Sequence, residues 1–383
     1  MSAGFPALHA VNGLFRARSG TRVEHEPLEA AAARRLRATG RGIGVRARAV
    51  HFTGPCRVEL RDLDLPEPAG ERVLVATERS GISSGTELLA YRGQVDPALP
   101  LDEAIGALAG TFAYPFRYGY SAVGRVLRPA GGWHEGQRVF AFHPHQDRFV
   151  ADPGELMPAD GLDPATATMY PLVETALQVS LDAAPRLGER VVVVGLGAVG
   201  ILVAALLARA GAEVLGCEPL PARRSVAGAF GIEAVPPERV GASVAERIGG
   251  RGADLVVEAS GNPEALGPAL ELLGHEGVAL VCSWYGTRPA SLPLGGAFHR
   301  RRLTIRSTQV STIAAAQRAR WVRSRRTELA WRLTRELPLH ALASREFDFE
   351  RAADAYAWLD AGRGDLVHAV LRYPSGPDGE EAR

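Results

Sequence analysis

The stretch RVVVVGLGAVGILVAALLARAGAEVLGCE, residues 190–218, decides the fold of this chain. It opens with four consecutive valines, and a run that is apolar on both faces is typical of a fully buried parallel strand. The glycine-rich turn GLGAVG follows at residues 195–200. The apolar residues 201–210 are then expected to form a helix, and residues 213–217 a second strand. Strand, glycine turn, helix and strand in this order predict a parallel βαβ unit.

The turn has the spacing G-x-G-x-x-G, in which each glycine has a separate role. Gly195 permits the tight turn, Gly197 allows a pyrophosphate to approach the backbone, and Gly200 allows the helix to pack closely on the strand. Unpaired N–H groups at the helix N-terminus, such as those of Ala198 and Val199, would then face the phosphates. The unit predicts a dinucleotide-binding site; the alternative is a similar unit that binds no nucleotide.

The acidic residue that ends the second strand bears on the choice of dinucleotide. Glu218 follows Gly200 by 18 residues, where a carboxylate can accept hydrogen bonds from the adenosine ribose. A carboxylate would also repel a 2′-phosphate, so we expect NAD. Arg223 and Arg224 lie just downstream and could hold such a phosphate or could be solvated helix charges, which leaves NADP possible.

Size and composition limit the class of protein. At 383 residues the chain can form two domains, and its net charge of +1 gives no reason to expect nucleic acid as a partner. Cys56, Cys217 and Cys282 are isolated from one another, which fits a reducing cytoplasm. No apolar run is long enough to span a membrane, and no signal peptide is evident. The absence of lysine excludes Schiff-base catalysis and a P-loop.

Five further segments carry a family resemblance. They are SGISSGTELL at 80–89, YGYSAVGRV at 118–126, EGQRVFAF at 135–142, ADLVVEASG at 253–261, and residues 347–373. Together with the glycine turn, they show that the chain resembles the medium-chain dehydrogenase/reductase superfamily of zinc alcohol dehydrogenase-like proteins from about residue 46 to 373. The resemblance implies an α/β fold in which a doubly wound Rossmann sheet is inserted in a chaperonin-10-like (GroES-like) β-barrel catalytic domain.

The resemblance also implies an order of domains. The Rossmann sheet would continue with strands at 254–259, 277–282 and 303–308, and the last would lie at an edge that pairs with a second subunit in a homodimer. Before it we expect strands at 47–52, 56–62, 72–78, 116–127 and 137–142, and after it an arginine-rich helix at 314–336. The expected domains are a basic extension (1–45), the catalytic domain (46–176 and 312–373), the Rossmann domain (177–311) and a tail (374–383).

Zinc members of the family carry a cysteine, a histidine and a third ligand ahead of the nucleotide fold. The matching residues here are Ser84, Tyr120 and Glu174, and only the last is a plausible zinc ligand. The four-cysteine structural lobe is also missing. We therefore expect no metal, although His143, His145 and Asp147 with Glu174 leave an unconventional metal site open.

Without zinc, side chains must handle the proton at the reacting oxygen. By residue match Thr86 takes the family's proton-relay position, and Tyr120 and Glu174 lie at former ligand positions. His143 matches a pocket position, and an ordinary histidine pKa near 6.5 suits acid–base work. Each has a structural alternative: Thr86 could cap a helix, Tyr120 could fill the space of the metal, and His143 could be a loop residue.

The ends of the later Rossmann strands would complete the cofactor site. Ser260 and Ser283 are expected there, and Trp284 and Tyr285 beside them could wall the nicotinamide or pack at the domain boundary. We thus expect a zinc-independent NAD(P)(H)-dependent oxidoreductase that acts on a small-molecule secondary alcohol or ketone in specialised biosynthesis. The alternatives are a quinone or enoyl reductase that acts on an activated C=C bond, a zinc-less dehydrogenase of bacteriochlorophyll side chains, or a non-catalytic nucleotide- or RNA-binding protein.

Overall fold

The computed structural model describes residues 44–248, 250–342, 344–362 and 368–374. The basic extension expected over residues 1–45 lies outside the described residues except for its last two. The tail expected over residues 374–383 lies outside them except for its first. In the described part, no helix is both long and apolar enough to cross a membrane.

One sheet is entirely parallel and has the strand order β11-β10-β9-β12-β13-β14. The valine strand β9 lies inside the sheet, and β14 lies at its edge, as the sequence predicts. The strands are β9 (Arg190–Val194), β10 (Glu213–Cys217), β11 (Ala234–Val235), β12 (Ala253–Glu258), β13 (Leu273–Val281) and β14 (Thr304–Ser307).

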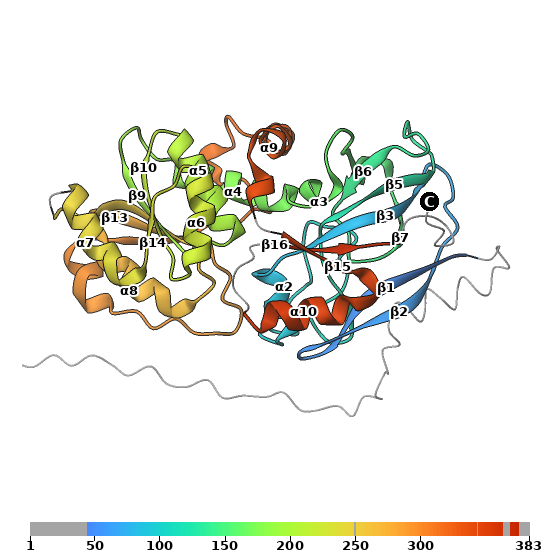
Figure 1. Ribbon diagram of the computed structural model, residues 1–383, viewed down its shortest axis with the longest axis horizontal. Coiled ribbons are helices and arrows are strands. Elements are labelled where there is room, and N and C mark those ends of the chain that lie inside the picture. The colour runs from blue at the N-terminus through green and yellow to red at the C-terminus, as the bar shows by residue number, and fades with distance from the viewer. Residues whose placement is uncertain (1–43, 249, 343, 363–367, 375–383) are drawn as a thin grey trace, which may run out of the picture. The chain divides into compact units, whose positions relative to one another are not determined.

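Helices cover both faces of this sheet because successive side chains of a strand point to opposite faces. Val191 and Val193 pack with α4, α5 and α9, whereas Val192 packs with α7 and α8. In Figure 1 the strands run between α4 and α5 on one side and α7 and α8 on the other. The helices are α4 (Tyr170–Ala183), α5 (Ala198–Arg209), α6 (Pro221–Ala229), α7 (Pro237–Ile248), α8 (Leu266–Glu271) and α9 (Arg323–Glu336).

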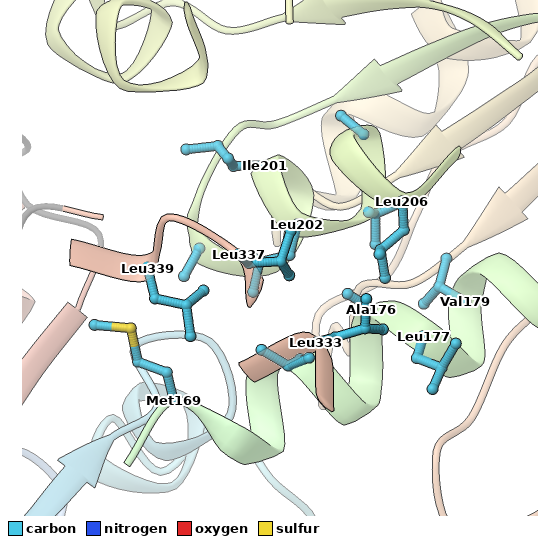
Figure 2. Close-up of a cluster of buried hydrophobic side chains, with 14 of the residues drawn as sticks. Met169, Ala176, Leu177, Val179, Ile201, Leu202, Leu206, Leu333, Leu337 and Leu339 are labelled. Carbon is cyan, nitrogen blue, oxygen red and sulfur yellow. The ribbon is translucent and has the colours of Figure 1, made fainter. Parts of the chain in front are cut away.

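The larger hydrophobic cluster joins the two long helices that frame the site. Leu202 and Leu206 of α5 lie against Ala176 of α4, and Leu333 and Leu337 come from the α9 region (Figure 2). Each fully buried leucine contributes roughly 1.5–3 kcal/mol to stability. This packing therefore fixes α4, which carries Glu174, against the nucleotide-binding helix α5.

The remaining strands form two mostly antiparallel sheets. One has the order β2-β1-β4, and the other has the order β15-β16-β3-β5-β6-β8, with β7 also paired to β3. The elements are β1 (Val45–Gly54), β2 (Arg57–Leu65), β3 (Val73–Ile82), α2 (Thr86–Tyr91), β4 (Phe116–Arg117), β5 (Ala122–Arg128), β6 (Arg138–Ala141), β7 (Arg148–Ala151), β8 (Leu156–Pro158), α3 (Pro164–Ala167), β15 (Ser344–Asp348), α10 (Ala352–Asp360) and β16 (His368–Arg372).

The single strand predicted at residues 116–127 is wrong. The structure has β4 and β5 in different sheets, separated by Tyr118 to Ser121. Gly119 breaks the strand with a φ of +104°, and a Cβ on it would lie 2.6 Å from the ring of His145. The backbone turns here because only glycine fits against that histidine, and the turn directs the next residue, Tyr120, toward α2.

The arginine-rich helix predicted at residues 314–336 begins nine residues later than expected. The helix α9 starts at Arg323, and only a short 3₁₀ turn, Ala315–Gln317, precedes it. The segment between β14 and α9 is therefore largely a loop, which leaves room for a cavity described below.

Candidate active site

The glycine turn has the geometry expected of a phosphate-binding loop. Gly195 has a φ of +89°, and a Cβ on it would lie 2.4 Å from the Cα of Ser260. A Cβ on Gly200 would lie 1.9 Å from the carbonyl oxygen of Gly195, whereas a Cβ on Gly197 would meet nothing within 4 Å. Two of the glycines thus allow close packing, and the third borders open space where a phosphate can approach.

The N-terminus of α5 leaves its first donors available. Gly197 is the N-cap and no side chain caps the helix. The N–H of Ile201 makes the first helical bond, to the Gly197 oxygen at 3.0 Å, so the N–H groups of Ala198, Val199 and Gly200 precede it. Such donors, together with the positive end of the helix dipole, form a site for a pyrophosphate.

Glu218 lies buried at the end of β10 beside the turn. Its Oε2 accepts a hydrogen bond from the N–H of Leu196 at 2.8 Å, and its Oε1 accepts one from Leu220 at 3.0 Å. Each carboxylate oxygen can accept a further bond. Glu218 therefore holds the glycine turn to β10 and keeps acceptor capacity for a ribose hydroxyl.

The two arginines after Glu218 differ in their contacts. Arg224 donates to the backbone oxygens of Glu218 and Pro219, both at 2.8 Å, so it supports the end of the strand. Arg223 is half-buried, and its Nε has no hydrogen-bond partner in the described part of the chain. The Nη1 group of Arg224 is thus engaged with the backbone, whereas the Nε of Arg223 is buried without a partner.

Glu258, at the end of β12, organises the other half of the nucleotide cleft and was not singled out from the sequence. Its side chain is fully buried and accepts bonds from the backbone and the hydroxyl of Ser260, and from the Tyr285 hydroxyl at 2.5 Å. Ser283 Oγ accepts from the Gly261 N–H at 2.8 Å. A carboxylate that ends a buried apolar strand was the signal that could have identified it.

Three hydroxyl groups from two segments form a cluster, called the hydroxyl cluster below. The side chains of Ser83 and Thr86 act on the phenol of Tyr120 and favour its ionised form. Burial raises the pKa of Tyr120 to about 12, and the negative charge of Glu87 contributes to this shift. The phenol is therefore protonated at neutral pH and can donate its proton to a substrate oxygen.

A chain of buried polar groups supports this cluster from behind. Glu87 accepts bonds from Ser83 N (2.8 Å), His145 Nε2 (2.9 Å) and the Tyr356 hydroxyl (2.5 Å). The other ring nitrogen of His145, Nδ1, shares a hydrogen bond with Ser80 Oγ at 2.7 Å. Both ring nitrogens of His145 are therefore in use, and Glu87, which the sequence analysis did not single out, fixes the Ser83 backbone.

His143 does not share the surroundings of this cluster. Its ring stacks on Phe149 with centroids 4.2 Å apart, and Nδ1 lies 3.1 Å from the Pro144 carbonyl oxygen, so Nδ1 carries the proton. Burial lowers the pKa of His143 to about 3. The expectation of an ordinary pKa near 6.5 is wrong, because desolvation keeps this ring neutral at neutral pH.

Glu174 forms a buried ion pair. Its Oε1 lies 3.2 Å from Nη2 of Arg326, and both side chains are less than a tenth exposed. Arg326 also donates to Gln178 Oε1 and to the Val310 carbonyl oxygen, both at 2.7 Å. The carboxylate that was expected as the surviving zinc ligand is thus neutralised by an arginine on α9.

The four residues considered for an unconventional metal site are used elsewhere. His145 bonds to Ser80 and Glu87, Glu174 to Arg326, and Asp147 accepts from the Arg48 N–H at 2.7 Å. Among the residues that the structure describes, no three His, Cys, Asp or Glu side chains lie close enough together to hold a metal ion.

The cofactor half and the hydroxyl half of the site are joined directly. Ser121, next to Tyr120, donates to the Thr168 carbonyl oxygen at 2.7 Å, just before α4 begins. After β13, the N–H of Thr287 donates to Gln94 O at 2.9 Å, and the ring of Trp284 lies 5.9 Å from that of Phe112. Thr86 and Tyr120 are thus brought together, whereas His143 and Glu174 have separate partners.

The fold and this site define a Rossmann-type protein with an antiparallel β domain. Residues 198–324 match the family model described as zinc-binding dehydrogenase. L-galactonate-5-dehydrogenase of Escherichia coli strain K12 is 30% identical over 185 residues, which cover 46% of this chain and 54% of that enzyme. The chain therefore spans about half the length of such curated relatives. A 2-desacetyl-2-hydroxyethyl bacteriochlorophyllide A dehydrogenase of Rhodobacter capsulatus is 28% identical over 290 residues, 70% of this chain and 84% of the relative.

Solved structures agree in fold. An alcohol dehydrogenase from E. coli CFT073 in complex with NADH has a TM-score of 0.67 at 17% identity and covers 86% of this chain and 100% of that one. A dehydrogenase from Sinorhizobium meliloti 1021 bound to NADP has a TM-score of 0.66 at 17% identity and covers 86% and 99%. The chain is thus similar in sequence to zinc-binding dehydrogenases over residues 198–324, and similar in fold to solved alcohol dehydrogenases over most of its length. The predicted fold class is confirmed.

Proposed function

We propose that this protein is an NAD(H)-dependent oxidoreductase that transfers hydride between the nicotinamide and a secondary alcohol or ketone without zinc. The observation that carries this proposal is the uncapped N-terminus of α5 beside Gly197, with Glu218 buried at the end of the neighbouring strand. The names of the relatives, which are dehydrogenases of hydroxylated compounds, support the same reaction class. When bound, the nicotinamide supplies the hydride chemistry.

The chain's own residues would bind and orient the cofactor. The N–H groups of Ala198, Val199 and Gly200 would bind the pyrophosphate, and Glu218 would accept a hydrogen bond from the adenosine ribose. Ser260 and Ser283, held by Glu258 and by Gly261, would line the nicotinamide half of the cleft. The negative charge of Glu218 favours NAD, whereas the positive charges of Arg223 and Arg224 just downstream are the feature that would admit NADP.

The hydroxyl cluster would handle the proton. In ketone reduction the Tyr120 phenol would donate to the carbonyl oxygen, and Ser83 and Thr86 would hold the phenol in place. Glu174, paired with Arg326, acts as a positioning residue in this proposal, and His143, which is neutral at neutral pH, takes no part in the proton transfer. A homodimer through the edge strand β14 and a cytoplasmic location stay predictions.

The decisive experiment combines metal analysis with a substrate screen. We expect purified protein to contain less than stoichiometric zinc and to oxidise NADH with ketones after treatment with a chelator. Stoichiometric zinc whose removal abolishes turnover would contradict the proposal. Turnover of enones but not ketones would identify a C=C reductase instead.

The choice of cofactor has its own test. Replacing Glu218 with alanine removes the charge that repels a 2′-phosphate, so the ratio of kcat/KM for NADH over NADPH should fall about tenfold, or about 1.4 kcal/mol. Glu264→Ala is the control, because that exposed carboxylate lies after β12 and away from β10. A wild-type preference for NADPH would reverse the assignment.

A further inference from the structure

The stretch between Glu276 and Glu328 carries a strong local charge although the whole chain is nearly neutral. It contains no aspartate or glutamate and ten arginines, whereas the formal net charge of the chain is +1. The arginines are Arg288, Arg300, Arg301, Arg302, Arg306, Arg318, Arg320, Arg323, Arg325 and Arg326. The charge is therefore concentrated around β14 and the start of α9.

A cavity of about 430 Å³ lies within this stretch, where the expected helix is replaced by a loop. Three arginines, two hydroxyl side chains and a tryptophan are part of its lining. The lining residues are Ser311, Thr312, Ile313, Arg318, Trp321, Val322, Arg323 and Arg326.

Two of the lining arginines are held in place by single backbone bonds. Arg318 Nε donates to Ile313 O at 2.9 Å, and Arg323 Nη2 donates to Ser311 O at 3.0 Å. Neither forms an ion pair with a carboxylate of the described residues, unlike Arg326, which pairs with Glu174. Each guanidinium has five N–H donors, so both retain donors for an anion.

The position of the cavity separates it from the cofactor phosphates. The pyrophosphate site is at β9, and β14 lies three positions further along the sheet, roughly 14 Å at 4.8 Å per strand. The loop that lines the cavity follows the carboxyl end of β14, and ligands of such sheets bind outside the carboxyl ends of the strands. Arg326 also ties the cavity to Glu174 on α4, which begins next to Tyr120.

We propose that this cavity binds an anionic group of the substrate, a carboxylate or a phosphate, at the end remote from the reacting carbon. The inference rests on the proposed function, since it names the class of alcohol or ketone that the hydroxyl cluster would act on. Arg318 and Arg323 bind the anion, and the hydroxyls of Ser311 and Thr312 complete its hydrogen bonds.

The first test measures binding without turnover. Inorganic phosphate is titrated calorimetrically into NADH-saturated protein at constant ionic strength, so that the cofactor's own phosphate sites are filled. We expect binding by the wild type, and a dissociation constant raised at least about tenfold in Arg318→Gln/Arg323→Gln. Arg320→Gln is the matched control, because Arg320 is exposed in the same segment and does not line the cavity. The variant Arg318→Lys/Arg323→Lys should retain most of the phosphate binding, because it keeps both positive charges.

Three outcomes would overturn the proposal. The first is equal weakening by Arg320→Gln, which would show diffuse surface attraction. The second is loss of phosphate binding when NADH is bound, which would assign the cavity to the cofactor. The third is unchanged binding in the folded double variant, as judged by its melting temperature.

The second test asks whether the anion belongs to a substrate. The binding of 4-oxopentanoate to NADH-saturated protein is compared with that of its methyl ester. The wild type should prefer the acid at least about tenfold, and the Gln/Gln variant should lose this preference; equal binding of acid and ester would contradict the proposal. If NADH itself does not bind, the proposed function fails. Phosphate titration of the free protein and of its variants would still show whether the cavity binds an anion.

Discussion

The glycine turn and the hydroxyl cluster are built from contacts of different range. The groups that shape the turn lie within one βαβ unit, apart from the approach of Ser260 to Gly195. The supports of the hydroxyl cluster come from far along the chain: Glu87 is bonded to His145, 58 residues away, and to Tyr356, 269 residues away. Local spacing therefore specifies the first region, whereas tertiary packing specifies the second.

The largest expected effect comes from the long-range ion pair. Arg326→Met leaves Glu174 charged and unpaired in the interior, which should lower the free energy of unfolding by about 3–5 kcal/mol. Adding Glu174→Leu should restore most of the loss, because the buried charge is removed. Denaturant unfolding of the two single variants and the double variant measures the coupling.

A surface pair provides the control for this cycle. Arg351 and Asp354 are both more than half exposed, so Arg351→Met should change the stability by at most about 0.5 kcal/mol. If Arg326→Met were equally mild, the Glu174–Arg326 pair would not hold α4 and α9 together, and the contrast between the two regions would weaken.

The differing range of contacts explains what could be predicted from the sequence. The expected strand over residues 213–217 and the edge position of β14 match the structure, because period and turn residues are local signals. The strand expected at 116–127 failed at Gly119, whose φ is imposed by His145 from another segment. Glu87 and Glu258 were missed because their importance lies in partners that no local pattern reveals.

The next effect tests the hydroxyl cluster itself. Tyr120→Phe removes the phenol that would donate the proton, so kcat for ketone reduction should fall about a hundredfold, or about 2.7 kcal/mol. Tyr114→Phe is the control: it loses one bond to Ala90 O, 2.6 Å long, and should cost about 1 kcal/mol of stability without affecting kcat. Steady-state kinetics and thermal unfolding together separate the two roles.

The pKa of Tyr120 also predicts how the rates of ketone reduction and alcohol oxidation should change with pH. With a pKa of about 12, the phenol is protonated throughout pH 6–9, so reduction should be nearly independent of pH in that range. Alcohol oxidation needs the phenolate, present in about one molecule in 10⁵ at pH 7, and should rise about tenfold per pH unit. A rate of alcohol oxidation that does not change with pH would show that another group accepts the proton.

Two glycines of the turn provide a matched pair of substitutions, whose expected effects on stability and on NADH binding are smaller. Gly200→Ala places a methyl group against the Gly195 oxygen and should cost about 2 kcal/mol of stability. Gly197→Ala meets open space and should leave stability unchanged within about 0.5 kcal/mol while weakening NADH binding, because the methyl group occupies the path of the pyrophosphate. Tight NADH binding by a folded Gly197→Ala variant would argue against the phosphate site.

The smallest effect is expected at His143. The family resemblance suggested that this residue acts as an acid or base, but its burial disfavours the protonated ring. Its pKa of about 3 means that it does not titrate between pH 6 and 9, so His143→Gln should leave the pH profile of kcat/KM unchanged there. The folded-state pKa is lower than the unfolded one, so the unfolded chain binds the extra proton between pH 6.5 and 3. Stability must then fall as the pH falls through that window, and His143→Gln should reduce this fall, whereas the exposed His134→Gln should not. A shift of the kcat/KM profile near pH 6.5 in His143→Gln would instead return this histidine to the active site.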